Sequence, residues 1–249
     1  MSDLEGKVVI VTGGSSGIGK EMVRELLLHN AKVYLTARNP EKTRNVIEEL
    51  TKATGKTAIF LNLNLRPEVC QSRCGGVPLV RIASYAAAEH FSSLPGKRRV
   101  YDRCAGGRLI IIGTSQRHAM PGPSDMLTVQ GYDYYFGVNV LGHFYFTKLP
   151  LPALLATEDK ARVVKTSSSA IYLPLGSKIL FDTLKDGQTK KSKSPMHLYG
   201  QFSMFVDVMF VLELARGYGD KGIVSISLHP GNLKTDLDQH ANWSNTVIW

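Results

Sequence analysis

One stretch decides the fold of this chain: Val8-Val9-Ile10-Val11-Thr12-Gly13-Gly14-Ser15-Ser16-Gly17-Ile18-Gly19-Lys20. Its four leading residues are apolar and mostly β-branched, and the run stops abruptly, which predicts a buried strand followed by a loop. Beyond Gly19, the apolar residues Met22, Val23 and Leu26 fall at helical spacing. Strand, glycine turn and helix in this order are the context that a nucleotide-binding fingerprint requires.

The glycines of this turn each have a physical use. Because glycine has no Cβ, Gly13 can turn tightly, Gly17 lets the backbone approach a pyrophosphate, and Gly19 lets the helix pack against the strand. The free N–H groups and positive dipole end of the helix would face the phosphates. We therefore expect Gly13, Ser15, Gly17, Ile18 and Gly19 to contact a cofactor.

Two motifs compete for these residues. Gly14-x-x-x-x-Gly19-Lys20 nearly spells a P-loop, but that loop needs Ser or Thr next to bind Mg²⁺, and Glu21 stands there instead. This argues against a nucleotide triphosphatase. The spacing Thr12-Gly13-x-x-x-Gly17-Ile18-Gly19 instead resembles the cofactor loop of the short-chain dehydrogenase/reductase family.

Length and composition favour one domain spanning residues 1–249. The 249 residues are 43% hydrophobic, which is ample for a single core. No run approaches the ~18 unbroken apolar residues of a membrane helix, and residues 1–7 do not form a signal peptide. The three cysteines fit neither a disulfide framework nor a zinc site. We expect a cytoplasmic protein with no membrane span, no metal and free thiols.

The net charge of +9 raises the question of a polyanionic partner. Between Arg66 and Arg117, nine basic residues face three acidic ones, so most of the excess lies in one segment. That segment has no recognisable nucleic-acid-binding pattern and little aromatic interleaving, and we expect no nucleic-acid partner.

Strands and helices alternate in the first part of the chain. Lys32–Ala37 is the second predicted strand, Pro40–Thr54 an amphipathic helix, and Thr57–Asn64 the third strand. The alternation predicts an α/β fold with a Rossmann-like, doubly wound parallel sheet in three layers. In the family, an Asp-Leu pair ends the third strand and binds adenine, and Asn64 stands at that position here.

The residue after the second strand selects the dinucleotide. An acidic side chain there would bind the 2′-hydroxyl of NAD, whereas Arg38 offers a planar cationic fork that suits a 2′-phosphate. Lys42 follows one turn later as a second cation. We therefore predict NADP(H) as the cofactor, against the alternative of a solvated surface arginine.

The resemblance fails between about residues 66 and 123, which we expect to be an atypical segment. Only residues 82–91 look helical there, and only Leu109–Ile112 looks like a buried strand. The family places an Asn-Asn-Ala-Gly turn after this fourth strand, and this chain has Gly113-Thr114-Ser115 instead.

The family pattern returns at Gly131 and supplies the predicted catalytic residues. Asn139 matches the catalytic Asn of a long helix, in which His143 is treated as an ordinary helix-face residue. Ser168, after the fifth strand at residues 162–170, matches the catalytic Ser. Tyr199 matches the Tyr of the Tyr-x-x-x-Lys motif. The resemblance implies that Tyr199 donates a proton and that Ser168 binds the reacting oxygen.

The lysine of that motif is absent. Position 203 is a serine, and Gln201-Phe202-Ser203-Met204-Phe205 is similar to the family's Gln-Ser-Lys-Phe with Phe202 inserted and Met204 in the place of the lysine. In the family this lysine lowers the pKa of the tyrosine and binds the nicotinamide ribose. The sequence leaves open whether residue 203 or residue 204 occupies its position.

A sixth strand, Ile223–Leu228, precedes His229-Pro230-Gly231-Asn232-Leu233-Lys234-Thr235. This resembles the family's Pro-Gly turn, in which Pro230, Leu233 and Thr235 would hold the nicotinamide amide. The sequence then ends at Trp249, before the last strand and substrate lid that the family usually has, so we expect a truncated C-terminus.

The chain is thus identified as a short-chain dehydrogenase/reductase, most similar to retinol-dehydrogenase-like and fungal alcohol-dehydrogenase-like members. The resemblance implies hydride transfer between NADP(H) and an alcohol or carbonyl in a small or lipophilic metabolite, as in fungal-type secondary metabolism. Two alternatives stay open: a nucleotide-binding pseudoenzyme, and a damaged gene model of such an enzyme. A homo-oligomer also stays open.

Overall fold

The computed structural model describes residues 3–63, 109–113, 126–128, 130–157, 159–167, 171 and 179–231. Its strands are β1 Val8–Thr12, β2 Lys32–Ala37, β3 Ile59–Asn62, β4 Leu109–Gly113, β5 Ala161–Thr166 and β6 Ile223–Leu228. Its α-helices are α1 Gly17–Leu28, α2 Pro40–Thr54, α5 Gly142–Lys148, α6 Leu151–Leu155, α7 Gln188–Lys191, α8 Pro195–Tyr199 and α9 Val206–Tyr218. Two π-helical segments, η2 Phe136–Leu141 and η5 Gly200–Phe205, and a 3₁₀ turn, η4 Phe181–Thr183, complete the list.

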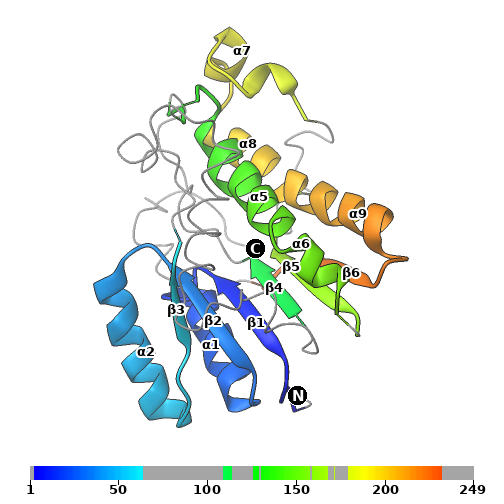
Figure 1. The fold of residues 1–249 in the computed structure, drawn as a ribbon. Coiled ribbons are helices and arrows are strands. Elements are labelled where there is room, and N and C mark those ends of the chain that lie inside the picture. Colours follow the sequence, from blue (N-terminus) through cyan, green and yellow to red (C-terminus); the bar gives the residue numbers. More distant parts are fainter. Residues whose placement is uncertain are drawn as a thin grey trace.

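The six strands form one parallel sheet in the order β3-β2-β1-β4-β5-β6. Figure 1 shows them side by side, with α2 beside β3 at one end and α9 beside β6 at the other. The strand order reverses between β1 and β4, which is the switch point where such sheets bind ligands. The predicted doubly wound sheet is therefore confirmed.

Alternation along the strands builds a separate core on each face of the sheet. Val9 and Val11 of β1 pack with α1 and α2, together with Leu27 and Leu50. Val8 and Ile10 face the opposite side, where residues of α5, α6 and α9 cover them. Successive side chains of a strand point to opposite faces, so β1 is buried on both sides. The three layers are thereby confirmed.

A third cluster joins the helical segments that carry two predicted catalytic residues. It contains Tyr135 and Val138 from one segment, and Tyr199, Phe202 and Met204 from the other. The rings of Phe136 and Phe202 lie 5.4 Å apart between centroids. This packing holds the two segments together independently of the sheet.

Local signals placed most element ends correctly. Helix α2 begins where predicted because Asn39 caps it, its side chain accepting a hydrogen bond of 3.0 Å from the Lys42 N–H. The helix ends at Gly55, whose φ of 72° is the left-handed cap that glycine favours. Strand β6 matches its prediction, and β3 and β5 are shorter than predicted. The predicted helix at residues 82–91 lies outside the described residues.

The two helices near the predicted catalytic residues differ from the regular α-helices we expected. Each contains a π-helical segment, η2 around Asn139 and η5 after Tyr199. A π turn closes i→i+5 hydrogen bonds and so accommodates one extra residue in a helix. The Phe202 insertion read from the sequence lies inside η5 and is absorbed in this way.

The helical run His197–Tyr218 is long and apolar enough to span a membrane by length and composition alone. However, 53% of its most apolar stretch is buried inside the structure. Its residues Val211 and Leu214 are buried, the latter in the core beneath α9. The same composition is typical of a core helix, and we interpret it so.

Candidate active site

The glycine turn lies at the carboxyl end of β1, beside the switch point. Gly13 and Gly17 have φ values of 67° and 51°, which other residues rarely adopt. Helix α1 begins at Gly17; its cap residue, Ser16, makes no side-chain cap hydrogen bond, and its first turn carries no acidic residue. An N-terminus of this kind offers N–H groups and a positive dipole end to an anion. The geometry therefore fits the pyrophosphate of a dinucleotide.

The other residues predicted to form the cofactor loop differ in their exposure to solvent. Ser15 and Ile18 are partly exposed, whereas Gly19 is buried against the sheet layer. Gly14, which was not predicted to contact the cofactor, is also buried, and a Cβ there would lie 2.7 Å from Leu35 Cγ. The loop thus depends on a close approach to β2 that only the fold reveals.

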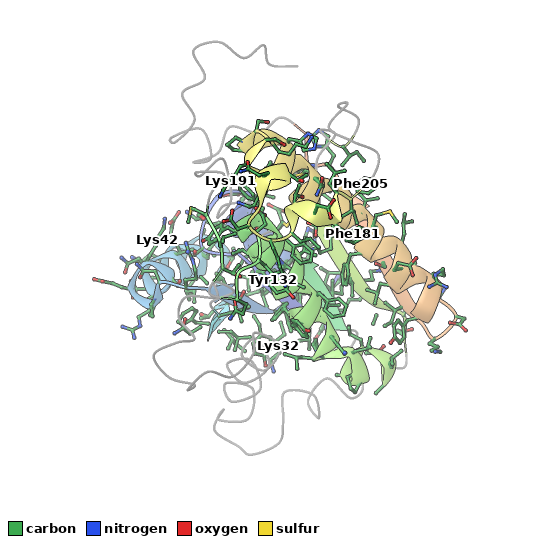
Figure 2. The ribbon with its side chains drawn as sticks, turned by 90° about the horizontal axis from the view of Figure 1, so that it is seen from above. Lys32, Lys42, Tyr132, Phe181, Lys191 and Phe205 are labelled. Atoms are coloured by element: carbon green, nitrogen blue, oxygen red, sulfur yellow. The ribbon has the colours of Figure 1, made fainter. Side chains whose placement is uncertain are left out.

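The predicted cation for a 2′-phosphate directly follows β2. Arg38 is half-buried there, one residue after Ala37, whose carbonyl accepts a hydrogen bond of 3.1 Å from the Leu63 N–H. Lys42 is exposed on α2, on the opposite side of the view from Phe205 (Figure 2). Asn64, the predicted adenine contact, lies outside the described residues.

A hydrogen-bonded chain links β1 to the predicted catalytic asparagine. His143 is only 3% exposed, so the expectation of an ordinary helix-face residue is wrong. Its Nδ1 lies 3.1 Å from the Asn139 carbonyl oxygen, and its Nε2 lies 3.5 Å from Thr12 Oγ1. Because a carbonyl only accepts, Nδ1 carries the proton. His143 therefore ties the Asn139 turn to the end of β1.

Tyr199 is 6% exposed and lies in the cluster between the two helical segments. The ring of Tyr135 meets it edge-on, with 5.9 Å between centroids. Burial raises the pKa of Tyr199 well above its ordinary value, and the negative charge of Asp207 and then Tyr135 add to this. Tyr199 is therefore held as a neutral phenol, able to donate a proton.

The π turn of this helix bears on which residue stands at the position of the motif lysine. The π turn of η5 brings residue i+5, rather than i+4, into line with Tyr199. Met204 is 1% exposed and shares the buried cluster of Tyr199, and its carbonyl accepts a hydrogen bond of 3.1 Å from Ser167 Oγ. The sequence left the choice between residues 203 and 204 open, and the π turn favours 204.

A buried ion pair lies beyond Met204, and the sequence analysis missed it. Lys165 Nζ lies 2.9 Å from Asp207 Oδ1, with 4% and 9% of the two side chains exposed. Burial raises the pKa of Asp207 to about 6, although Lys165 opposes the shift. No local pattern could have revealed the pair, because its members come from β5 and α9.

Several predicted site residues lie outside the described ranges: Asn64, Ser168, Leu233 and Thr235. The nearest described residues are Leu63, Ser167 and Gly231. The Ser167 N–H donates to the Leu228 carbonyl at 2.8 Å, which aligns the ends of β5 and β6. Pro230 is half-buried just after β6, and Gly231 has a φ of 85°. The predicted positions of Ser168 and of the Pro-Gly turn thus follow adjacent strand ends.

Comparison with known proteins assigns the family. The model for short chain dehydrogenases matches residues 7–73. A short-chain dehydrogenase/reductase from Armillaria gallica is 46% identical over 243 residues, covering 96% of this chain and 69% of that protein. Human retinol dehydrogenase 11 is 29% identical over 246 residues, covering 99% of this chain and 67% of its own length.

Solved structures share the fold at lower identity. A short-chain dehydrogenase from Escherichia coli CFT073, in complex with NADPH, has a TM-score of 0.62 at 22% identity and covers 98% of this chain and 84% of that one. L-Sorbose reductase from Gluconobacter frateurii has a TM-score of 0.60 at 17% identity, with coverages of 94% and 72%. The chain belongs to the short-chain dehydrogenase/reductase family, whose members are oxidoreductases that act on small molecules with a nicotinamide cofactor.

Proposed function

We propose that this chain is an NADP(H)-dependent oxidoreductase that interconverts an alcohol and a carbonyl group in a small or lipophilic metabolite. The observation that carries the proposal is the arrangement around the switch point. The glycine turn and α1 present an anion site there, and half-buried Arg38 follows the neighbouring strand. Tyr199 is a buried phenol in the helical layer that also holds Asn139.

The cofactor contacts follow from these positions. Gly13 and Gly17 would receive the pyrophosphate against the N–H groups of α1, and Arg38 would pair with a 2′-phosphate. The E. coli structure and the sorbose reductase structure both contain NADPH, which supports the same choice for this chain. When bound, the cofactor supplies the hydride of a reduction or accepts that of an oxidation.

The chain's own residues handle the proton. In a reduction the carbonyl oxygen gains negative charge, and Tyr199 neutralises it by donating its phenolic proton. Ser168, matched by its sequence motif, would hydrogen-bond the same oxygen. An oxidation needs Tyr199 as a phenolate base, which burial and the absence of the lysine disfavour. We therefore propose that the chain works mainly as a reductase.

A second candidate is a nucleotide-binding protein without catalysis. The observation that favours it is the apolar Met204 in the place of the motif lysine. Such a protein would retain the glycine turn and Arg38 and would bind NADPH without turnover.

Turnover by the purified full chain distinguishes the two candidates. NADPH oxidation would be followed at 340 nm with a panel of aldehydes and ketones, for the parent and for Tyr199→Phe. Loss of the proton donor should slow reduction by about 10²- to 10⁴-fold. Both proteins should bind NADPH equally. If the parent binds NADPH but is no faster than Tyr199→Phe on every substrate, the chain is a binding protein.

Cofactor preference is tested at Arg38. A charge-assisted contact contributes about 1.5–3 kcal/mol, so Arg38→Ala should weaken NADPH binding by roughly 10- to 150-fold and leave NADH binding unchanged. Arg44→Ala, which removes an exposed cation from α2, is the matched control. Calorimetry that finds equal losses for NADPH and NADH, or none, would show that Arg38 does not select the cofactor.

A further inference from the structure

Two opposite charges, those of Lys165 on β5 and Asp207 on α9, lie buried between the sheet and that helix. Lys165 and Asp207 are 4% and 9% exposed, and the ring centroid of Phe210 lies 5.7 Å from Lys165 Nζ. Removing two ions from water costs several kcal/mol each, which pairing only partly offsets. Well-packed apolar residues at these positions would fold at least as well, so stability alone gives no reason for the pair.

The fold makes room for the lysine. Lys165 pairs in register with Gly113 of β4, and a Cβ on Gly113 would lie 3.1 Å from Lys165 Cδ and 3.6 Å from His143 Cδ2. The alkyl stem of Lys165 therefore crosses the end of β4 beside His143. The ammonium group of Lys165 therefore contacts Asp207 from the side of β4.

Asp207 lies on the same helical face as Tyr199. Met204 follows Tyr199 by one π turn, and Asp207 follows Met204 by three α-helical residues, which together make close to two full turns. All three side chains are buried. Ser167, two residues after Lys165 on β5, binds the Met204 carbonyl between them at 3.1 Å. Strand β5 thus holds this helical face at two points.

A carboxylate on this face acts on the phenol. Tyr199 is neutral before it gives up its proton and negative afterwards, and a nearby anion in a poorly solvated layer disfavours the negative form. After burial itself, the charge of Asp207 is the largest contribution that raises the Tyr199 pKa. Among the described residues, the other titratable groups near this face are Lys165, paired with Asp207, Tyr135, which meets Tyr199 edge-on, and His143 near the Lys165 stem.

We propose that Asp207, held in place by Lys165, is a positioning residue that disfavours the phenolate form of Tyr199, the form that must take a proton from an alcohol, and so restrains alcohol oxidation at this site. Asp207 would thus act on the pKa of Tyr199 in the opposite direction to the family's lysine, which lowers the pKa of the tyrosine. This inference rests on the proposed function for its direction of reaction, but its electrostatic part concerns Tyr199 alone.

The test reads the ionisation of residue 199 without turnover. 3,5-Difluorotyrosine, whose phenol is more acidic than that of tyrosine, is placed at position 199 of the full chain, and its ¹⁹F shift is followed from about pH 7 to pH 11. Across this range Asp207 is ionised. Asp207→Asn should lower the midpoint by about one pH unit. Asp207→Glu should restore it.

A second buried ion pair provides the matched control. Lys190 Nζ lies 3.4 Å from Asp133 Oδ2, and both side chains are 1% exposed. Lys190→Met removes a buried charge from a pair whose Asp133 stands two residues before Tyr135, and it should move the ¹⁹F midpoint less than Asp207→Asn does. Equal shifts in Asp207→Asn and Lys190→Met would mean that general loosening moves the midpoint, which overturns the proposal.

A double variant covers the case in which Asp207→Asn does not fold. Lys165→Met with Asp207→Leu removes both charges and leaves no unpaired ion. Its midpoint should also fall, but by less than in Asp207→Asn, because the Lys165 ammonium group, which favours the phenolate, is removed together with the carboxylate. An unchanged midpoint in whichever variant folds overturns the proposal.

The activity measurement separates this inference from the proposed function. In Asp207→Asn, the kcat of alcohol oxidation divided by the kcat of carbonyl reduction, both at saturating substrate and pH 8, should rise about tenfold, following the one-unit shift. If no variant and no parent protein turns over, the proposed function fails, while the ¹⁹F midpoint still decides the role of Asp207. If turnover is normal and the midpoint does not move, the inference alone fails.

Discussion

The two halves of the sheet are stabilised in different ways. Strands β1 to β3, with α1 and α2, bury only threonines among their polar side chains: Thr12, Thr36 and Thr43. Strands β4 to β6 and their helices bury two complete ion pairs, Lys165–Asp207 and Lys190–Asp133. The first half carries the glycine turn and most of the predicted cofactor contacts, whereas the second half carries the buried charges.

The helices of the two halves also differ in the regularity of their backbones. Helices α1 and α2 are regular, and a side-chain cap, an N-terminal proline and a C-terminal glycine delimit α2. On the other half, η2 and η5 interrupt the helical segments that carry Asn139 and Tyr199. π segments are rare and often occur at functional sites. The difference teaches that local sequence signals are enough to predict β1 to β3 with α1 and α2, which we call the cofactor half. The structure of β4 to β6 and their helices, the catalytic half, depends on contacts between residues far apart in the sequence.

The largest effect is expected from a lysine placed in the π turn, which would make the catalytic half resemble the family pattern. Met204→Lys brings an ammonium group into line with Tyr199 and should lower the pKa of that phenol by about 1–3 units. Alcohol oxidation at neutral pH should then rise by roughly 10- to 10³-fold. Steady-state rates with NADP⁺ and a panel of alcohols would measure the change.

Two controls accompany this variant. Met204→Leu tests whether altered packing alone changes the rate, and Ser203→Lys places the same charge one residue earlier. In a regular α-helix residue 203 would follow Tyr199 by one turn, but in η5 residue 204 does. A gain in Ser203→Lys and none in Met204→Lys would show that the helix is regular at this point in solution.

The next largest effect is a change in the unfolding free energy with acid pH, and it comes from Asp207 in the half that contains β4 to β6. The pKa of Asp207 is about 6 in the folded protein against 3.8 for an ordinary aspartate, so folding favours its protonated form. Its contribution to stability is complete below pH 3.8 and is lost as the pH rises through about 6. Relative to Asp207→Asn, the parent should lose roughly 2–3 kcal/mol of unfolding free energy across this window.

Urea unfolding at several pH values would measure this slope. Asp182→Asn removes an exposed carboxyl group from η4 and should leave the parent's slope unchanged. Parallel slopes for the parent and Asp207→Asn would mean that Asp207 ionises in the folded protein as it does in the unfolded chain.

The smallest effect is expected in the cofactor half, where packing rather than charge is altered. In Gly14→Ala, the new Cβ would lie 2.7 Å from Leu35 Cγ and 3.1 Å from Val23 Cγ2. Overpacking of this kind should destabilise the fold by about 1–2 kcal/mol. Gly187→Ala, with no heavy atom within 4 Å of its Cβ, is the control and should be neutral. Equal melting temperatures for the two variants would show that the loop yields without cost.

The sequence predicted more of the fold than of the site. Short apolar runs predicted all six described strands, and Pro40 with the amphipathic pattern after it predicted α2. The site residues were predicted one by one from their places in motifs, as for Gly13, Gly17, Arg38 and Tyr199. Burial of His143 was missed because its partners lie on β1 and one turn back on its own helix.

By itself, the sequence determined the parallel sheet, the glycine turn at its switch point and the candidate proton donor, because these depend on residues close together in the chain. Only the tertiary structure favours Met204 over Ser203 at the position of the motif lysine, since an extra residue in a helix can shift the face or be absorbed in a π turn. It also decided that Lys165 and Asp207 meet, because strand β5 and helix α9 approach one another only when the sheet has formed.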